Sequence, residues 1–377
     1  MLGALLLFLI AGHAELPALE PIKGLSNRAI KKSLRRGIDF LIQDQNKDGS
    51  WGTPHRTKSL NIYAPVPGAH HAFRAAVTSL CTSALIENAR LNRRIRHAVD
   101  RVVPWFEAEL PKVKRATPAA LYNVWAHAYS IQALVRLHRH YSKEPDRQEK
   151  FKELIRLQMQ YLERYELVDG GWSYYDFQYR TQKPGGSSSS FTTATVLIAL
   201  DEARELGLDM PEKFIKRAVA SIRRQQKPDL TYLYGDYFRY YPMSSINRPG
   251  GSLGRSQACN LAMRRWGDKK ITNEVLKEWL ARLIQRNGWL SIGRKRPVPH
   301  EAWFAVAGYF YYYGHYYAGL CMEELPKKER RIYQPHLARI ICDLQEKDGS
   351  WWDYPLYNYH QQYGTAFALM TLKRCLK

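Results

Sequence analysis

Two kinds of helical segment alternate along this chain. In the first kind, apolar residues recur every three or four positions on one face and charged residues occupy the other, as Ile30, Leu34, Ile38 and Leu41 show. The second kind is apolar or small nearly all round, which predicts helices buried on every side. The half-polar segments are 26–44, 92–108, 146–165, 212–226, 273–286 and 328–345; the apolar segments are 70–88, 121–141, 189–205, 252–266, 300–322 and 360–376.

This alternation predicts an all-α fold in which six apolar inner helices form a ring and six half-polar outer helices surround it. Short connections would make each outer helix and the next inner helix an antiparallel hairpin. The aromatic run 309–317 has strand propensity, but it lies inside a helical pattern, and no strand is expected. The predicted architecture is an (α/α)6 toroid of six helical hairpins. Residues 26–377 would form a single domain after a linker at 15–25.

The N-terminus has the features of a secretory signal peptide. Residues 2–11 form an apolar run that is too short to span a bilayer, and small residues precede Glu15. The usual basic segment before the run is missing, and a frayed hydrophobic helix is the alternative interpretation. We predict a signal peptide at 1–14 and an exported protein, periplasmic or extracellular.

A seven-residue motif marks boundaries between the two kinds of segment. Residues 45–51 are Gln-Asn-Lys-Asp-Gly-Ser-Trp, and residues 345–351 repeat this sequence with only the second residue changed. Weaker copies lie at 169–172 and 285–289, and a more divergent copy begins at 226. Asp-Gly predicts a turn with the glycine at positive φ, the Gln amide can bond nearby backbone, and the Trp can pack over the junction. These roles are structural.

The motif resembles the QW repeat of squalene and oxidosqualene cyclases, which the β-subunits of protein prenyltransferases share in a looser form. The resemblance covers nearly the whole chain after residue 25. It implies the α/α toroid of the terpenoid cyclases and prenyltransferases, with a central cavity for the ligand. It also implies that the protein binds an isoprenoid or other apolar molecule and, if it is an enzyme, transforms it.

The catalytic motifs of those families have no counterpart in this sequence. The Asp-x-Asp-Asp acid of class II cyclases opens an inner helix, and the matching stretch here is Ser189-Ser190-Phe191-Thr192, which offers no carboxylic acid. Prenyltransferases hold Zn²⁺ through an Asp-x-Cys pair and a later His. His360 resembles that His, whereas the pair is replaced by His300-Glu301. Because His and carboxylate suit Zn²⁺, zinc stays an open alternative, although adjacent helix residues point about 100° apart.

The composition adds a strong positive charge. With 57 Lys and Arg against 35 Asp and Glu, the formal net charge is +22. Such a field attracts an anionic membrane surface or an acidic polysaccharide, and a solvated outer ring is the alternative explanation. Nucleic acid is not expected as a partner of an exported protein. The five cysteines form no CxxC pair and do not indicate a disulfide framework.

Candidate site residues lie near the predicted N-termini of the inner helices, which in a toroid share one mouth of the cavity. The expected ligand-binding residues are His70, His71, Tyr122, Trp125, Arg255, His300, Trp303 and Tyr363. The groups expected to act on a ligand are Asp176, Asp236, Glu301 and His360. The connecting loops add Tyr174, Tyr175, Phe177, Tyr237, Arg248 and Tyr357. Aromatic faces suit carbocations and apolar chains, and together with Arg and His they also suit sugars. Simple filling of the middle of the toroid is the alternative.

Three functions remain open at this point. The first is a secreted toroid similar to squalene cyclases or prenyltransferases. It would bind an isoprenoid or other apolar ligand and, if it is an enzyme, transform it. The second is a secreted carbohydrate-active enzyme, a lyase or hydrolase for acidic polysaccharide, in which Arg255, His360 and Tyr363 supply the neutralising group and the base. The third is a binding protein without catalysis. The expected partner is therefore an apolar small molecule or a glycan.

Overall fold

The computed structural model describes residues 18–57, 68–178 and 183–376. Over these residues the chain forms α-helices joined by loops and short 3-10 turns, with no β-strand. The signal peptide predicted at 1–14 lies outside the described residues. No helix in the described ranges has the length and apolar character needed to cross a bilayer.

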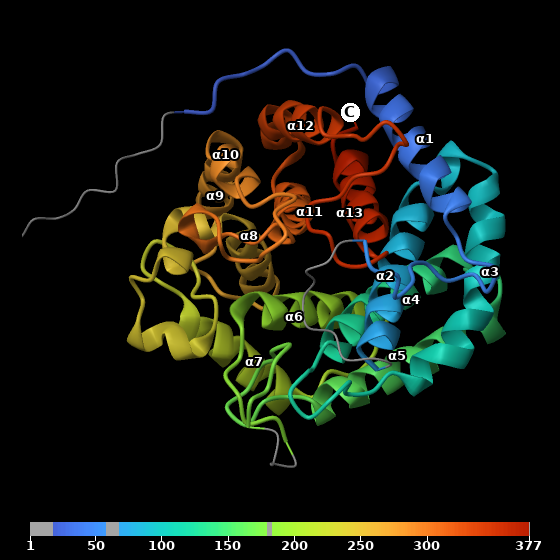
Figure 1. Cartoon of the computed structure of the whole chain (residues 1–377), viewed down its shortest axis with the longest axis horizontal. Helices are drawn as coiled ribbons and strands as arrows, with labels where there is room; N and C mark the ends of the chain where they lie inside the picture. Colours follow the sequence, from blue (N-terminus) through green and yellow to red (C-terminus); the bar gives the residue numbers. More distant parts are fainter. Residues whose placement is uncertain (1–17, 58–67, 179–182, 377) are drawn as a thin grey trace, which may run out of the picture.

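Six helices form a closed inner ring around the centre of the molecule (Figure 1). Each contacts the next in chain order, and the last contacts the first, which closes the ring. Nearly every residue of these helices is buried, as their apolar composition predicts. They are α2 (Gly68–Glu87), α4 (Asn123–His140), α6 (Ser190–Arg204), α8 (Pro249–Arg265), α11 (Phe310–Glu323) and α13 (His360–Arg374).

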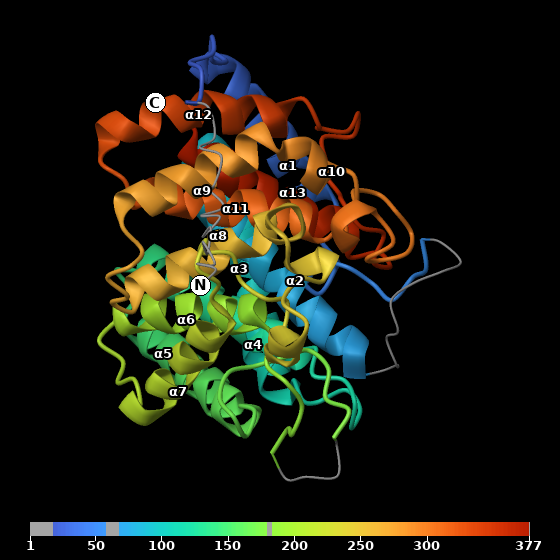
Figure 2. The ribbon, with the colours of Figure 1, turned by 90° about the vertical axis from the view of Figure 1, so that its left-hand side faces the viewer.

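Six outer helices surround this ring, and each is followed in the chain by one inner helix; each such pair is counted below as one hairpin. Contrary to the expectation, the first three outer helices pack mainly against the inner helix that precedes them around the ring. They bury one face only; the first buries Ile30, Leu34, Ile38 and Leu41 and leaves its charges outside. Figure 2 shows α7, α9 and α12 stacked along one side of the ring. The outer helices are α1 (Asn27–Gln43), α3 (Arg94–Glu109), α5 (Pro145–Arg164), α7 (Glu212–Gln225), α9 (Asn273–Gln285) and α12 (Lys327–Cys342). The predicted all-α toroid is confirmed.

The repeated motif forms the same turn wherever its sequence is intact. Gly49 and Gly349 have φ values of 90° and 94°. In the first copy the Trp51 indole donates to the Leu41 carbonyl at 2.7 Å, and in the last copy Trp351 donates to Ile341 at 2.8 Å. The Gln45 and Gln345 amides each donate to the glycine carbonyl of their own turn at 2.8 Å. The motif therefore fixes the backbone between an outer and an inner helix.

Both intact turns, and the turn of the weaker copy at 169–172, also dock on the next outer helix through an arginine. Arg101 of α3 donates to backbone carbonyls of the first turn, and Arg217 of α7 does the same at the turn that contains Gly170. Arg36 of α1 donates to the carbonyls of residues 346 and 347 at 2.8 and 2.9 Å. Because α1 belongs to the first hairpin and this turn to the last, the same contact that joins neighbouring hairpins also closes the ring.

The divergent copy that begins at Gln226 keeps the turn although five of its seven residues differ from those of the first copy. Asp229 accepts bonds from the Thr231 amide and hydroxyl at 3.1 and 2.6 Å, as Asp48 does from Ser50 in the first copy. Tyr232, fully buried, takes the place of the Trp. Leu230 takes the place of the glycine and has a φ of 58°, a conformation that costs a leucine about 1–2 kcal/mol.

The fifth hairpin departs from the prediction. Residues 285–289 do not form the turn: Asn287–Ser291 is a short helix, α10, and Gly288 does not take a positive φ. The fifth inner helix begins at Phe310 instead of residue 300. The intervening chain cannot continue a helix because Lys295, His300, Phe304 and Ala305 all have positive φ.

Candidate functional site

A cavity of about 720 Å³ lies at the centre of the inner ring. This volume falls within the range of small-molecule sites. Its wall comes from inner helices and from the loops that precede them. The lining residues are mostly aromatic and include Phe73, Tyr122, Trp125, Tyr129, Tyr174, Tyr175, Phe177, Phe191, Tyr234, Tyr237, His300, Tyr309, Phe310, Tyr313, Tyr354, Tyr363 and Phe367.

The described part of the cavity wall is uncharged. Among the residues that the structure describes, no Asp, Glu, Lys or Arg lines it. The polar side-chain atoms on the wall belong to tyrosines, serines, Trp125, His300 and Gln178. Aromatic rings meet edge to face or tilted around the cavity, as Phe191 does with Phe310 at a centroid distance of 5.0 Å. Such a wall favours an apolar ligand. The polar groups are concentrated at a few places on the wall.

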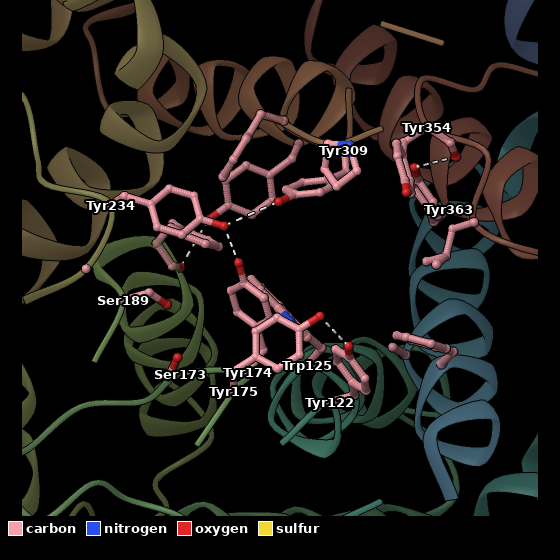
Figure 3. Close-up of a pocket in the computed structure, with 18 of the residues that line it drawn as sticks. Tyr122, Trp125, Ser173, Tyr174, Tyr175, Ser189, Tyr234, Tyr309, Tyr354 and Tyr363 are labelled. Carbon is pink, nitrogen blue, oxygen red and sulfur yellow. Dashed lines mark hydrogen bonds between the residues drawn. The ribbon is translucent and has the colours of Figure 1, made fainter. Parts of the chain in front are cut away.

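One of these points is a cluster of three tyrosine hydroxyls and one imidazole, which we call the tyrosine cluster: Tyr174, Tyr234, Tyr309 and His300. Figure 3 shows the three hydroxyls pointing toward one another across the wall. The Tyr234 hydroxyl bonds to that of Tyr174 and lies 3.3 Å from that of Tyr309. The Tyr309 hydroxyl lies 2.9 Å from Nε2 of His300. Burial raises the pKa of all three tyrosines well above the usual value, so each keeps its proton.

His300 is held in one tautomer. Its Nδ1 lies 2.8 Å from the Ala305 carbonyl, which can only accept, so Nδ1 carries the proton and Nε2 is an acceptor. Burial lowers the pKa of His300, which keeps the ring neutral near pH 7. The residue has a φ of 65° and lies in the segment that replaces the start of the fifth inner helix. Strained backbone of this kind is concentrated at functional sites.

A buried cation lies behind the tyrosine cluster. Arg255 of α8 is 1% exposed, and its guanidinium donates to the carbonyls of Tyr232, Gly251 and Ile246 at 2.9, 2.8 and 2.5 Å. It lies over the ring of Tyr234, 5.7 Å from the ring centroid. Desolvation lowers the pKa of Arg255 to about 10, so the group stays charged at neutral pH. Within the described chain, no carboxylate forms an ion pair with it.

A buried acid lies behind the wall at Tyr363. The Tyr363 hydroxyl donates to Oδ1 of Asp353 at 2.6 Å, and the Tyr312 amide donates to Oδ2 at 3.0 Å. Asp353 is fully buried, and desolvation raises its pKa to about 7. Asp353 does not itself line the cavity.

The four residues predicted to act on a ligand lie outside the cavity wall. Asp176 and Asp236 are buried in ion pairs, with Arg115 at 2.6 Å for the first and with Arg224 and Arg239 for the second. Glu301 is exposed and lies 3.8 Å from Arg296. His360 is buried against the Trp352 ring, with Nδ1 2.6 Å from the Tyr357 carbonyl. The structure thus gives the two aspartates a role in holding loops.

The predicted ligand-binding residues divide into two groups. Tyr122, Trp125, His300 and Tyr363 line the cavity, as do the loop residues Tyr174, Tyr175, Phe177 and Tyr237. His70, His71, Arg255, Trp303 and Tyr357 do not. His70 lies 3.1 Å from the Tyr359 hydroxyl, His71 lies 3.4 Å from Glu109, and Trp303 is 72% exposed.

The residues considered for zinc do not form a site. No group of three or more His, Cys, Asp or Glu among the described residues could hold a metal ion. His300 and His360 are separately bonded to backbone carbonyls, and Glu301 faces Arg296. The prenyltransferase zinc centre therefore does not fit this side-chain arrangement.

Sequence reasoning did not select Tyr234, Tyr309 or Asp353. Tyr309 was placed inside a helix, whereas it immediately precedes α11 and points into the cavity. Asp353 follows the intact motif by two residues, and this position was the one signal that the sequence offered for it. The QW turn ends where the chain approaches an inner helix, so residues just after the motif lie near the ring. Tyr234 follows the divergent motif by two residues in the same way.

Comparisons with known proteins support the fold at low sequence identity. No protein-family model and no curated protein matches the chain. Among solved structures, the type II terpene cyclase MstE from Scytonema, in a variant bound to geranylgeranyl dihydroxybenzoate, is 13% identical with a TM-score of 0.56 over 93% of this chain and 98% of that one. An unsaturated glucuronyl hydrolase from Streptococcus agalactiae is 13% identical with a TM-score of 0.56 over 94% of each chain.

An α-amylase from Clostridium perfringens is similar to the same degree, with 12% identity and a TM-score of 0.55 over 91% of this chain and 97% of that one. These proteins bind or act on an isoprenoid in one case and on carbohydrate in the other two. The likeness establishes the α/α toroid for this chain, and the choice between the two ligand types has to come from the cavity.

Proposed function

We propose that this protein binds an isoprenoid or another elongated apolar molecule in the central cavity. The observation that carries the proposal is the wall itself, which is aromatic and, over the described residues, free of charged side chains. Burying an apolar chain against such a surface is favourable by about 25 cal/mol per Å² of apolar area. The likeness to a terpene cyclase bound to a geranylgeranyl compound supports the same choice.

A glycosidase-type function receives less support. Glycoside hydrolysis in most families uses two carboxyl groups that flank the bond to be cleaved. Asp176 and Asp236 are held in ion pairs away from the cavity, and Glu301 is exposed beside Arg296. Asp353 reaches the wall only through the Tyr363 hydroxyl. The described residues therefore provide no such pair at the cavity.

Exposed aromatic residues provide an entry for an apolar ligand. Phe177 and Tyr237 line the cavity and are 77% and 51% exposed. Tyr240, Tyr241 and Met243 follow on the next stretch of chain and are each about as exposed as Phe177. Together with the net charge of +22, this surface suits contact with an anionic membrane, where apolar ligands are found.

Mass spectrometry of the purified protein tests the proposal. A lipid extract of the native protein should contain an apolar molecule in near-stoichiometric amount. In the variant Ala76→Trp the new indole occupies the cavity from α2, and the molecule should be absent. The matched control is Ala220→Trp on α7, outside the cavity. A glycan in place of a lipid, or equal amounts in both variants, would contradict the proposal.

A further inference from the structure

The tyrosine cluster gives a mostly apolar cavity one polar end. The number of hydroxyl protons in the cluster determines how many hydrogen bonds it can donate to a ligand. Three hydroxyl protons are present on Tyr174, Tyr234 and Tyr309. His300 accepts only one of them, because its Nδ1 is already a donor to the Ala305 carbonyl. Either Tyr309 or Tyr234 can supply it, since their hydroxyls lie 2.9 and 3.3 Å from Nε2. The other two protons bond to neighbouring hydroxyl oxygens, and such hydroxyls can rotate. The cluster therefore has two donors that a ligand oxygen can redirect.

The charge behind the cluster decides which oxygen is favoured. Arg255 is fully buried and bonded only to backbone carbonyls, and the described chain supplies no acidic partner. A buried charge of this kind is stabilised by an opposite charge within the same low-dielectric region. The guanidinium lies over the Tyr234 ring, 5.7 Å from the ring centroid, so an anion at the Tyr234 hydroxyl would lie within its field.

We infer that the ligand is an apolar chain that ends in a carboxylate, and that the tyrosine cluster binds this carboxylate. Its oxygens would accept the hydroxyl protons of Tyr174 and Tyr234, with the field of Arg255 in support. A neutral alcohol or ester would accept the same hydrogen bonds without the gain from Arg255. The positive field of the whole molecule also favours entry of an anion over a neutral ligand. This inference rests on the proposed apolar cavity and adds the chemistry of its polar end.

Parinaric acid and its methyl ester test the inference, because the polyene fluorescence of both reports transfer into an apolar site. The unmodified protein should bind the acid at least tenfold more tightly than the ester at pH 8. Tyr174→Phe removes a donor that both probes can use, and it should weaken binding of the acid several-fold more than binding of the ester. The matched control is Tyr175→Phe, which removes a hydroxyl that bonds to Tyr122 outside the cluster. The control should keep the full preference.

The contribution of the charge is tested with Arg255→Gln, which should abolish the preference for the acid. If this variant does not fold, as judged by circular dichroism, the double variant Tyr174→Phe/Tyr309→Phe serves in its place. Equal binding of acid and ester by the unmodified protein would overturn the inference and leave the apolar cavity standing. Failure of both probes to bind would overturn the proposed function as well.

Discussion

The first and last junctions of the ring, at residues 45–51 and 345–351, contrast with the fifth junction at 285–309. In the first two, the intact motif makes a seven-residue turn in which glycine, glutamine and tryptophan have identical partners. In the fifth, the motif is degraded, and the chain forms α10 and then a strained segment that carries His300 to the cavity.

The difference shows that the turns that stabilise the ring and the residues that form the polar end of the cavity lie in different parts of the chain. Intact repeats hold the ring together and contribute nothing charged to its centre. The members of the tyrosine cluster, Tyr174, Tyr234, His300 and Tyr309, belong to the third, fourth and fifth hairpins. In the fifth hairpin, where the motif does not form its turn, the segment that follows carries the imidazole of His300 to the cavity.

The largest effect is expected at Asp353, where the intact sixth junction meets the displaced fifth inner helix. The pKa of Asp353 is raised from an ordinary value near 4 to about 7, so the folded state favours the protonated form. Its stabilising effect is complete at low pH and is lost as the pH rises through 7. Asp353→Asn removes this cost, and its free energy of unfolding at pH 8 should exceed that of the parent by up to ~4 kcal/mol. Denaturant unfolding at pH 4 and pH 8 measures this, and a difference independent of pH would contradict it.

Glycine substitutions compare the two kinds of junction directly. In Gly349→Ala the new Cβ would lie 2.6 Å from the Arg36 carbonyl oxygen at a φ of 94°, and a loss of about 3 kcal/mol is expected. In Gly288→Ala the Cβ meets nothing within 4 Å and lies in α10, so a gain of about 0.5–1 kcal/mol is expected. Thermal unfolding of both variants checks this pair. Equal effects would mean that the fifth junction is as constrained as the sixth.

The smallest effect is expected at the fourth junction, which keeps the turn with a leucine in the glycine position. Leu230→Gly should relieve the positive-φ strain and raise the stability by at most ~1 kcal/mol, because part of the gain is offset by chain entropy. A matched substitution, Leu206→Gly, removes the same side chain at a position without positive φ and should destabilise the protein. A rise in the melting temperature for Leu230→Gly alone supports the assignment of residues 226–232 to the repeat.

The ring was predictable because its signals are periodic. Half-polar and apolar helices alternate in a pattern that recurs along the sequence, and α1 with Ile38 on its buried face is an example of the half-polar kind. The turn at Gly49 recurs in the same way. The cavity was predictable only in part. Tyr122 and Trp125 lie at a helix start and were found. Tyr309 was missed because positive φ at His300 and Ala305 delays the start of the fifth inner helix by ten residues, to Phe310. No pattern in one sequence predicts that strain.

The charged candidates show a second limit of sequence reasoning. Asp176 and Asp236 lie in the right loops, but nearby arginines, Arg115 and Arg224, pair with them and hold them away from the cavity. Whether such an acid faces the cavity depends on its arginine partner, which lies 61 residues away for Asp176 and 12 residues away, on α7, for Asp236. Such pairing becomes visible only in three dimensions.

Titration with all-trans-retinol, a fluorescent isoprenoid, tests the central claim most directly. The parent protein and Ala220→Trp should bind retinol in the cavity at one site per chain, with energy transfer from Trp125 to the bound polyene. Ala76→Trp should weaken binding at least a hundredfold while its circular dichroism stays unchanged. Unchanged affinity in Ala76→Trp, or no saturable binding by the parent, would contradict the claim that the centre of this ring is an apolar ligand site.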